Sequence, residues 1–225
     1  GNLITANELL DMFDRDTLRF YFMFYGPETR DTNCSIEDIT QVHNKFLVGV
    51  LGNFVNRNLA FINKKFDGVI KEGIIDEKII AFTEKTYKIV GTLIEKGEFK
   101  NALNYIVEYI SMGNKYYDEK QPWIQVKEDI EGFNNTTYTC TYMISNIANL
   151  MEPFTPDASK KIRKMLSLPK YKWEVNNISG DLKVNNIVLL YERIDDNNGI
   201  RLTKESDHTE NRIKIYYEPS IEKSK

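Results

Sequence analysis

Apolar residues recur at three- and four-residue spacing up to about residue 168, the pattern of amphipathic helices. The longest such segment is predicted to run from Ser35 to about Phe66, with Asp67-Gly68 ending it. Its inward face is expected to carry Ile36, Ile39, Val42, Phe46, Val50, Phe54 and Phe61. Gly52 lies inside this helix, where glycine costs about 1 kcal/mol relative to alanine. We therefore expect Gly52 to allow close approach of a neighbouring element.

Shorter helices are predicted on both sides of that segment. Thr5-Ala6-Asn7-Glu8 has the pattern of a capping box, and Asp16 to Tyr25 should form a second helix with Leu18, Tyr21 and Phe22 on one face. Four further helices are expected over residues 76–96, 98–120, 130–151 and from Pro156 to before Pro169, with Pro122 closing the second of them. Short connections between long amphipathic helices indicate antiparallel packing.

The pattern changes after Lys170. Trp173, Val175, Ile178 and the run 188–190 indicate irregular chain packed on the bundle, and the polar tail holds one strand-like piece at 213–217. The predicted fold is all-α: an antiparallel helix bundle with a short N-terminal helical segment and an irregular C-terminal extension. We divide the chain at residues 1–34, 35–170 and 171–225.

Charge gives little indication of a nucleic-acid partner. The formal net charge of the 225 residues is −3, whereas a nucleic-acid binder usually shows a basic patch. A local exception is the stretch 57–71, which contains one acidic residue, Asp67, and four basic ones: Arg57, Lys64, Lys65 and Lys71. A solvated helix end explains these charges equally well.

The residues of a catalytic or metal centre are missing. The twelve glycines form no phosphate-binding loop, and two cysteines and two histidines far apart build neither a zinc site nor a nucleophilic pair. No apolar run is long enough for a membrane span, and the N-terminus does not resemble a signal peptide. A cytoplasmic protein without membrane contact is the default expectation.

Two features are unusual for purely structural residues. Asn53 and Arg57 are four residues apart, so they share a helix face and could bind the edge of a nucleobase. Trp123 follows Pro122 just past a predicted helix end, where an exposed indole could stack on an unpaired base. Taken singly, a polar contact between helices and a tryptophan capping the core are the better explanations.

These pieces occur in an order that resembles the C-terminal half of methionyl-tRNA synthetases, over roughly residues 1–195. The matching pieces are Gly1-Asn2-Leu3-Ile4, the runs 16–21, 51–57 and 63–68, Asp118 to Trp123, and the runs 151–156 and 190–195. The resemblance implies that residues 1–34 end a segment contacting the tRNA stem, and that 35–170 form an anticodon-binding bundle.

The resemblance also implies roles for single residues. Trp123 would stack on the first anticodon base, with Pro122 setting the indole's position, and Asn53 and Arg57 would read base edges. Asp118 would repel the phosphates of wrongly seated loops. Lys64 and Lys65 could contact backbone phosphates, although a solvated role is equally compatible with the sequence.

The partners implied are the anticodon loop of tRNA(Met), read as CAU, and a catalytic domain of the same parent chain. The parent would join methionine to tRNA using ATP and Mg. This sequence contains neither the HIGH-type motif nor the KMSKS loop of that catalytic half, and it looks like a piece beginning just after the latter. No cofactor, metal or catalytic residue is therefore expected here. The alternatives are a helical protein-interaction bundle and the anticodon domain of another class I aminoacyl-tRNA synthetase.

Overall fold

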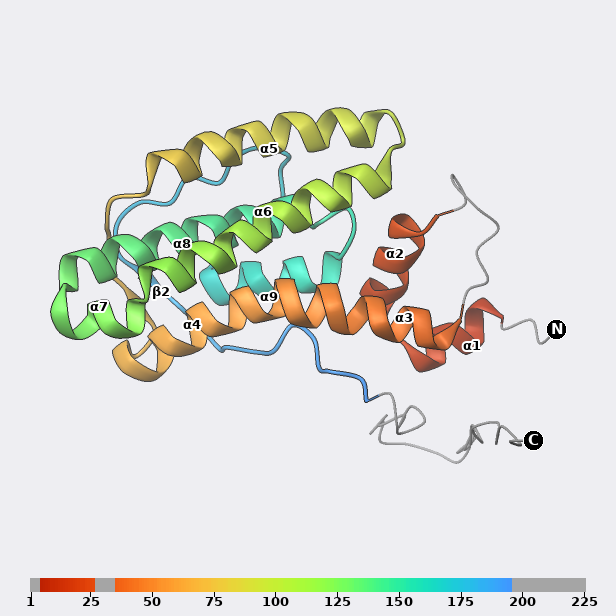
Figure 1. The fold of residues 1–225 in the computed structure, drawn as a ribbon, viewed down its shortest axis with the longest axis horizontal. Helices are drawn as coiled ribbons and strands as arrows, with labels where there is room; N and C mark the ends of the chain where they lie inside the picture. The colour runs from red at the N-terminus through yellow and green to blue at the C-terminus, as the bar shows by residue number, and fades with distance from the viewer. Residues whose placement is uncertain (1–4, 27–34, 196–225) are drawn as a thin grey trace, which may run out of the picture.

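The computed structural model describes residues 5–26 and 35–195. The motif at residues 1–4, Cys34, His208 and the strand-like piece at 213–217 lie outside the described residues. Within the described part the regular structure is almost all helical, with only two two-residue strands, which confirms the all-α class (Figure 1). The elements are α1 (Ala6–Met12), α2 (Arg15–Phe24), α3 (Ile36–Val42), the π-helix η1 (His43–Gly52), α4 (Asn53–Phe66), β1 (Val69–Ile70), α5 (Glu77–Glu95), α6 (Phe99–Lys120), α7 (Pro122–Glu128), α8 (Ile130–Leu150), α9 (Pro156–Leu166) and β2 (Leu182–Lys183).

The long helices lie side by side around α8. Every residue of α8 from Thr136 onward is buried, so this helix is the centre of the core, and α5, α6, α7 and α9 contact it. In Figure 1, α4 and α5, α5 and α6, and α8 and α9 run in opposite directions, as the short connections between them require. Lys96 is the C-terminal cap of α5, and the chain turns toward α6 at Gly97. The φ of Gly97 is 75°, a left-handed value that glycine adopts readily.

The predicted long helix is continuous from Ile36 to Phe66, but its middle is not an α-helix. The segment η1 is π-helical, with hydrogen bonds spanning five residues. The fully buried apolar positions consequently step from Val42 to Leu47 and then to Leu51, while the predicted Phe46 and Val50 are partly buried and pack against the core. The α-helical period used for the prediction therefore missed Leu47 and Leu51.

Gly52 does not permit the approach of a neighbouring element, contrary to our expectation. A Cβ built at Gly52 would lie 2.9 Å from the carbonyl oxygen of Leu47, which belongs to the same helix. The close approach occurs at Gly113 of α6 instead, where an added Cβ would lie 2.6 Å from the ring of Phe54. Gly113 thus lets α6 come close to α4.

The N-terminal helices are attached to the bundle by polar contacts. Asp16 of α2 accepts hydrogen bonds from the backbone N–H groups of Asp157 and Ala158, at 3.1 and 2.8 Å. These groups lie in the first turn of α9, whose own cap residue Thr155 makes no side-chain cap. Asp16 therefore caps a helix of the bundle from outside it. Leu18, Tyr21 and Phe22 of α2 were predicted to share one face. Leu18 and Tyr21 are buried, but Phe22 is 46% exposed, so the prediction was wrong for Phe22.

The C-terminal extension returns along the bundle. Its strand β2 pairs with β1 in antiparallel register. Near the start of the extension, backbone groups bind Asn146 and Asn149 of α8, and near its end they bind His43 and Asn44 of η1. Buried polar side chains of the bundle thus find partners in the backbone of the extension. Within the run 188–190, Leu190 is buried, but Val188 and Leu189 are exposed. The boundaries at residues 34 and 170 stay a prediction.

Candidate nucleic-acid interface

Two pairs of side chains connect α4 to α6 at the surface of the bundle. The Nδ2 group of Asn53 donates to Oδ1 of Asn114 at 2.9 Å, and Arg57 pairs with Asp118. Asn53 and Arg57 are four residues apart on α4, and Asn114 and Asp118 are four residues apart on α6. In each pair the two partners are 61 positions apart in sequence. The two helices therefore run in the same direction here and present matching faces. Gly113 and Phe54, at the close approach of the helices, are sequence neighbours of the first pair.

Tyr117 brings Arg57 and Trp123 together. The Arg57 guanidinium carbon lies 4.2 Å from the centroid of the Tyr117 ring, a cation–π contact. The Trp123 ring centroid lies 5.7 Å from that of Tyr117, with a tilt of 44° between the rings. Tyr117 is buried, and burial raises its pKa to about 12, so the phenol stays neutral. The three side chains form one contiguous arrangement in which the outer two reach solvent.

Trp123 lies in a short helix that the sequence analysis did not predict. Helix α6 ends at Gln121, whose φ of 51° is left-handed, and Pro122 then starts α7 instead of only closing α6. Pro122 is buried at the first helical position, where proline's fixed φ is suitable. The Trp123 side chain is 40% exposed and Asn53 is also exposed. The proline thus fixes the backbone from which the indole projects.

Asp118 is an exposed carboxylate with a cationic partner. Its side chain is 60% exposed, while that of Arg57 is 23% exposed. The hydrogen bond from Arg57 holds the pKa of Asp118 below its ordinary value. Since Arg57 carries five N–H donors, the pair leaves donors of the guanidinium unused by Asp118. The predicted role of Asp118 in repelling the phosphates of wrongly seated loops must therefore take this pairing into account.

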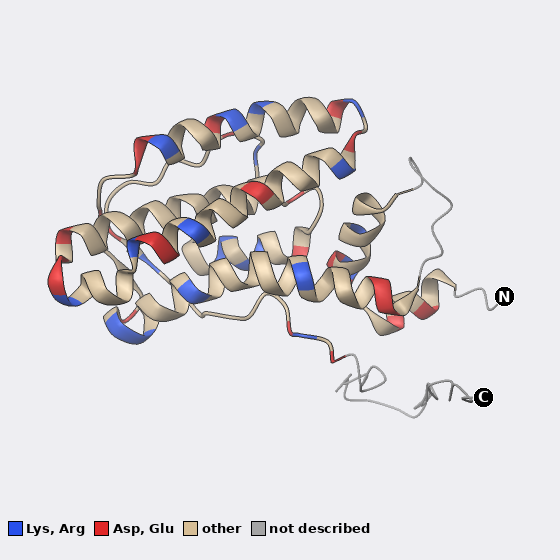
Figure 2. Cartoon of the chain, viewed as in Figure 1, with Lys and Arg blue, Asp and Glu red and all other residues tan. Residues whose placement is uncertain are grey.

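The expected basic stretch 57–71 is less positive than its composition indicates. Arg57 is paired with Asp118, and the Nζ of Lys71 lies 2.6 Å from a carboxylate oxygen of Asp181. Lys64 and Lys65 remain exposed in the last turn of α4, where Figure 2 shows basic residues. Along α5, by contrast, acidic and basic residues are interspersed (Figure 2). The local positive charge is thus concentrated on these two lysines.

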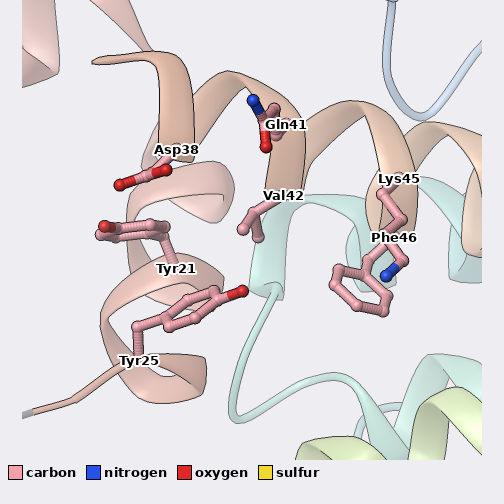
Figure 3. Close-up of a pocket in the computed structure, with 7 residues that line it drawn as sticks. All are labelled: Tyr21, Tyr25, Asp38, Gln41, Val42, Lys45 and Phe46. Carbon is pink, nitrogen blue, oxygen red and sulfur yellow. The ribbon is translucent and has the colours of Figure 1, made fainter. Parts of the chain in front are cut away.

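A cavity of about 230 Å³ lies elsewhere, between α2 and the α3–η1 helix (Figure 3). Its lining consists of Tyr21, Tyr25, Asp38, Gln41, Val42, Lys45 and Phe46. None of the predicted site residues contributes to it. In the described part of the chain, no group of three or more metal-ligating side chains forms a cluster, and no helix has the length and apolar character of a membrane span.

Two residues of this surface were missed by the sequence analysis. Tyr117 and Asn114 both belong to α6, and each contacts a residue that was predicted. A signal existed, because Asn114 and Asp118 repeat the four-residue spacing of Asn53 and Arg57. The sequence alone could not show that the two faces meet.

Two protein-family models match successive parts of the chain. Residues 1–59 match a family model described as class I tRNA synthetases (M), and residues 70–188 match the model of the anticodon binding domain of methionyl tRNA ligase. A methionine–tRNA ligase of Bacillus cereus (strain B4264) is 40% identical over 188 residues, as is one of Bacillus mycoides (strain KBAB4). Each alignment covers 84% of this chain and 34% of the relative. The chain thus spans about a third of the length of these relatives.

Solved structures show the same fold. The apo form of Mycobacterium tuberculosis methionyl-tRNA synthetase superposes with a TM-score of 0.79 at 21% identity, covering 86% of this chain and 41% of that one. The form of that enzyme bound by methionyl-adenylate gives a TM-score of 0.79 at 22% identity, covering 85% of this chain and 40% of that one.

Proposed function

Because this chain belongs to the family of methionyl-tRNA ligase anticodon-binding domains, we propose that it reads the CAU anticodon of tRNA(Met) with the surface between α4, α6 and α7. The observation that carries this proposal is the contiguous arrangement of Arg57, Tyr117 and Trp123. It offers a partly exposed indole for stacking and a guanidinium beside it for hydrogen bonding.

Trp123 would stack on the first anticodon base. An anticodon loop is single-stranded, so its bases can leave the stack and lie on an aromatic ring. Tyr117 supports the indole from inside and itself stays buried, which limits the platform to one exposed ring. Asn53 and Arg57 would then bind base edges, since a carboxamide donates and accepts while a guanidinium donates.

The loop backbone would extend toward Lys64 and Lys65. Lys64 follows Arg57 by seven residues, which is two helical turns along the same face, about 10 Å further on. Exposed ammonium groups at that distance suit contacts with phosphates. Asp118 would orient Arg57 and disfavour loops whose phosphates approach it, a contribution to specificity through repulsion.

The test is binding of the chain to two anticodon stem-loops, one carrying CAU and one carrying a scrambled loop. We expect clearly tighter binding of the CAU loop, and Arg57→Ala should remove that preference. Equal affinities for both loops in the unaltered chain would contradict the proposal. The alternative, a protein-interaction bundle, requires no affinity for either loop. Preference for another anticodon would indicate a different class I synthetase.

The parent protein would join methionine to tRNA in the cytoplasm, using ATP and Mg in a catalytic domain beyond this sequence. This chain alone should give no methionine-dependent exchange between ATP and pyrophosphate, because this sequence contains neither the HIGH-type motif nor the KMSKS loop of the catalytic half. Detectable exchange would contradict that assignment.

A further inference from the structure

The carboxamide of Asn114 is held in one orientation by backbone carbonyl groups. Its Nδ2 lies 3.1 Å from the carbonyl oxygen of Val50 and 3.5 Å from that of Ile110. A carbonyl oxygen only accepts, so the nitrogen of the Asn114 amide must face both of them and its oxygen must face away. The Val50 carbonyl lies where η1 passes into α4, and it also accepts from the backbone N–H of Asn53.

This orientation determines that of Asn53. The outward oxygen of Asn114 can only accept, and the atom of Asn53 that lies 2.9 Å from it is therefore the amide nitrogen. Rotating the Asn53 amide by half a turn would place two oxygens against each other. The oxygen of Asn53 is thus turned away from the Asn114 oxygen, and Asn53 itself is exposed.

We propose that Asn114 is a positioning residue that fixes the acceptor of Asn53 toward the bound base, so that the site selects a base presenting a hydrogen-bond donor. This inference rests on the proposed function and adds a source of its specificity. Cytosine carries an amino donor at the position where uracil carries a carbonyl acceptor. A fixed Asn53 oxygen attracts the first group and repels the second, whereas a freely rotating amide accommodates both.

The test compares stem-loops carrying CAU and UAU, which differ only at the first anticodon base. Asn114→Ala should lower the ratio of the CAU affinity to the UAU affinity about 2- to 13-fold, the usual worth of one hydrogen bond. Asn114→Asp keeps an acceptor for Asn53 and should keep the ratio within about twofold, while its added negative charge weakens binding of both loops. Asn104→Ala, an exposed change on the same helix, should leave the ratio and both affinities unchanged.

The outcomes separate this inference from the proposed function. If the unaltered chain prefers CAU to a scrambled loop but Asn114→Ala retains the full CAU-to-UAU ratio, the positioning role is wrong and the anticodon site stands. A ratio in Asn114→Asp as low as that in Asn114→Ala would also overturn it, because the acceptor alone would not explain the selectivity. No preference in the unaltered chain would overturn both. Thermal unfolding of each variant shows that the ratios come from folded protein.

Discussion

Asp16 and Asp118 are both carboxylates that one helix presents to hydrogen-bond donors of another, yet their surroundings are opposite. Asp16 is 2% exposed and binds two backbone N–H groups of α9 as well as the hydroxyl of Tyr191. Asp118 has a side chain that is 60% exposed and accepts a hydrogen bond from Arg57. The buried carboxylate joins three parts of the chain, whereas the exposed one holds a side chain that can still bind something else.

The difference also appears in their pKa values. Burial raises the pKa of Asp16, against the opposing effect of the backbone N–H groups. The Arg57 hydrogen bond lowers that of Asp118. The two shifts have different causes, since desolvation dominates for the buried Asp16 and a hydrogen bond from a cation dominates for the exposed Asp118. Variants at the two positions should therefore differ in their effects on stability and on loop affinity.

The largest expected effect is the loss of Asp16. Asp16→Ala leaves two N–H groups at the start of α9 without their acceptor, and unsatisfied buried donors cost about 1–3 kcal/mol each. We expect the free energy of unfolding to fall by about 2–4 kcal/mol, measured by urea denaturation. Asp16→Asn keeps one acceptor oxygen and should lose less.

The same change should leave the affinity for a CAU loop unaltered at temperatures where the variant is folded. A loss of affinity equal to that of an Arg57 variant would show that the two regions are coupled, and the comparison would fail.

The second prediction uses the two tryptophans. Trp123→Ala should weaken binding of a CAU loop about 5- to 150-fold, since stacking contributes roughly 1–3 kcal/mol per base. Trp123 is partly exposed, so the free energy of unfolding should change little. Fluorescence titration with the stem-loop measures the affinity, and denaturation measures the stability.

Trp173 is the matched control. Its ring lies 5.4 Å from that of Tyr87, and a Cβ at Gly91 would lie 2.9 Å from its Nε1. Trp173→Ala should lower the free energy of unfolding by about 1–3 kcal/mol, as core truncations commonly do, without changing loop affinity. The reverse pattern, in which Trp123 is needed for folding and Trp173 for binding, would contradict the proposed role of Trp123 in binding the loop.

The third prediction concerns charge alone. Lys64→Ala and Lys65→Ala should weaken CAU and scrambled loops equally, and each lost phosphate contact should reduce the salt slope of binding by about 0.7 for single-stranded RNA. Lys71→Ala should have a smaller effect, because Lys71 is already paired with Asp181. Our sequence interpretation treated Lys71 as unpaired, and the structure corrects it. Titrations at several salt concentrations measure the slope, and an unchanged slope for Lys64 and Lys65 would assign them a solvated role.

Most of the helical bundle could be predicted from the sequence, because apolar spacing and capping residues are local signals. The ranges 76–96 and 98–120 agree with α5 and α6 to within about a residue. The π-helix was not predictable in this way, since its five-residue step departs from the period that the prediction assumed. Gly52 and Gly113 illustrate the limit: glycine's effect depends on what lies beside it, which only the packing reveals.

The site was predicted in part for a related reason. Asn53, Arg57 and Trp123 were selected from spacing and a family resemblance, and their placement in the structure is compatible with a shared surface. The contacts of Asn53 with Asn114 and of Arg57 with Asp118 depend on α4 and α6 lying side by side. Antiparallel neighbours imply that helices two apart in sequence run in the same direction, but no local signal shows that two such helices are in contact.

The smallest expected effect is the contribution of the Arg57–Asp118 pair to stability. Exposed ion pairs contribute about 0.2–1 kcal/mol, so Asp118→Asn should lower the free energy of unfolding at pH 7 by less than about 1 kcal/mol. The pKa of Asp118 is lower in the folded protein than in the unfolded one, so the contribution is present above about pH 4 and is lost as the pH falls through the lowered value. For Asp16, whose pKa is raised, the sign is opposite: the folded state is most stable with this carboxyl protonated, and the stability decreases as the pH rises through the raised value, although the carboxylate still accepts its hydrogen bonds. Denaturation of the unaltered chain, Asp118→Asn and Asp16→Asn between about pH 3 and 7 should therefore give stability differences that change in opposite directions. Parallel changes would mean that Asp118 is not held by Arg57 in solution, and that the guanidinium is not positioned before a base arrives.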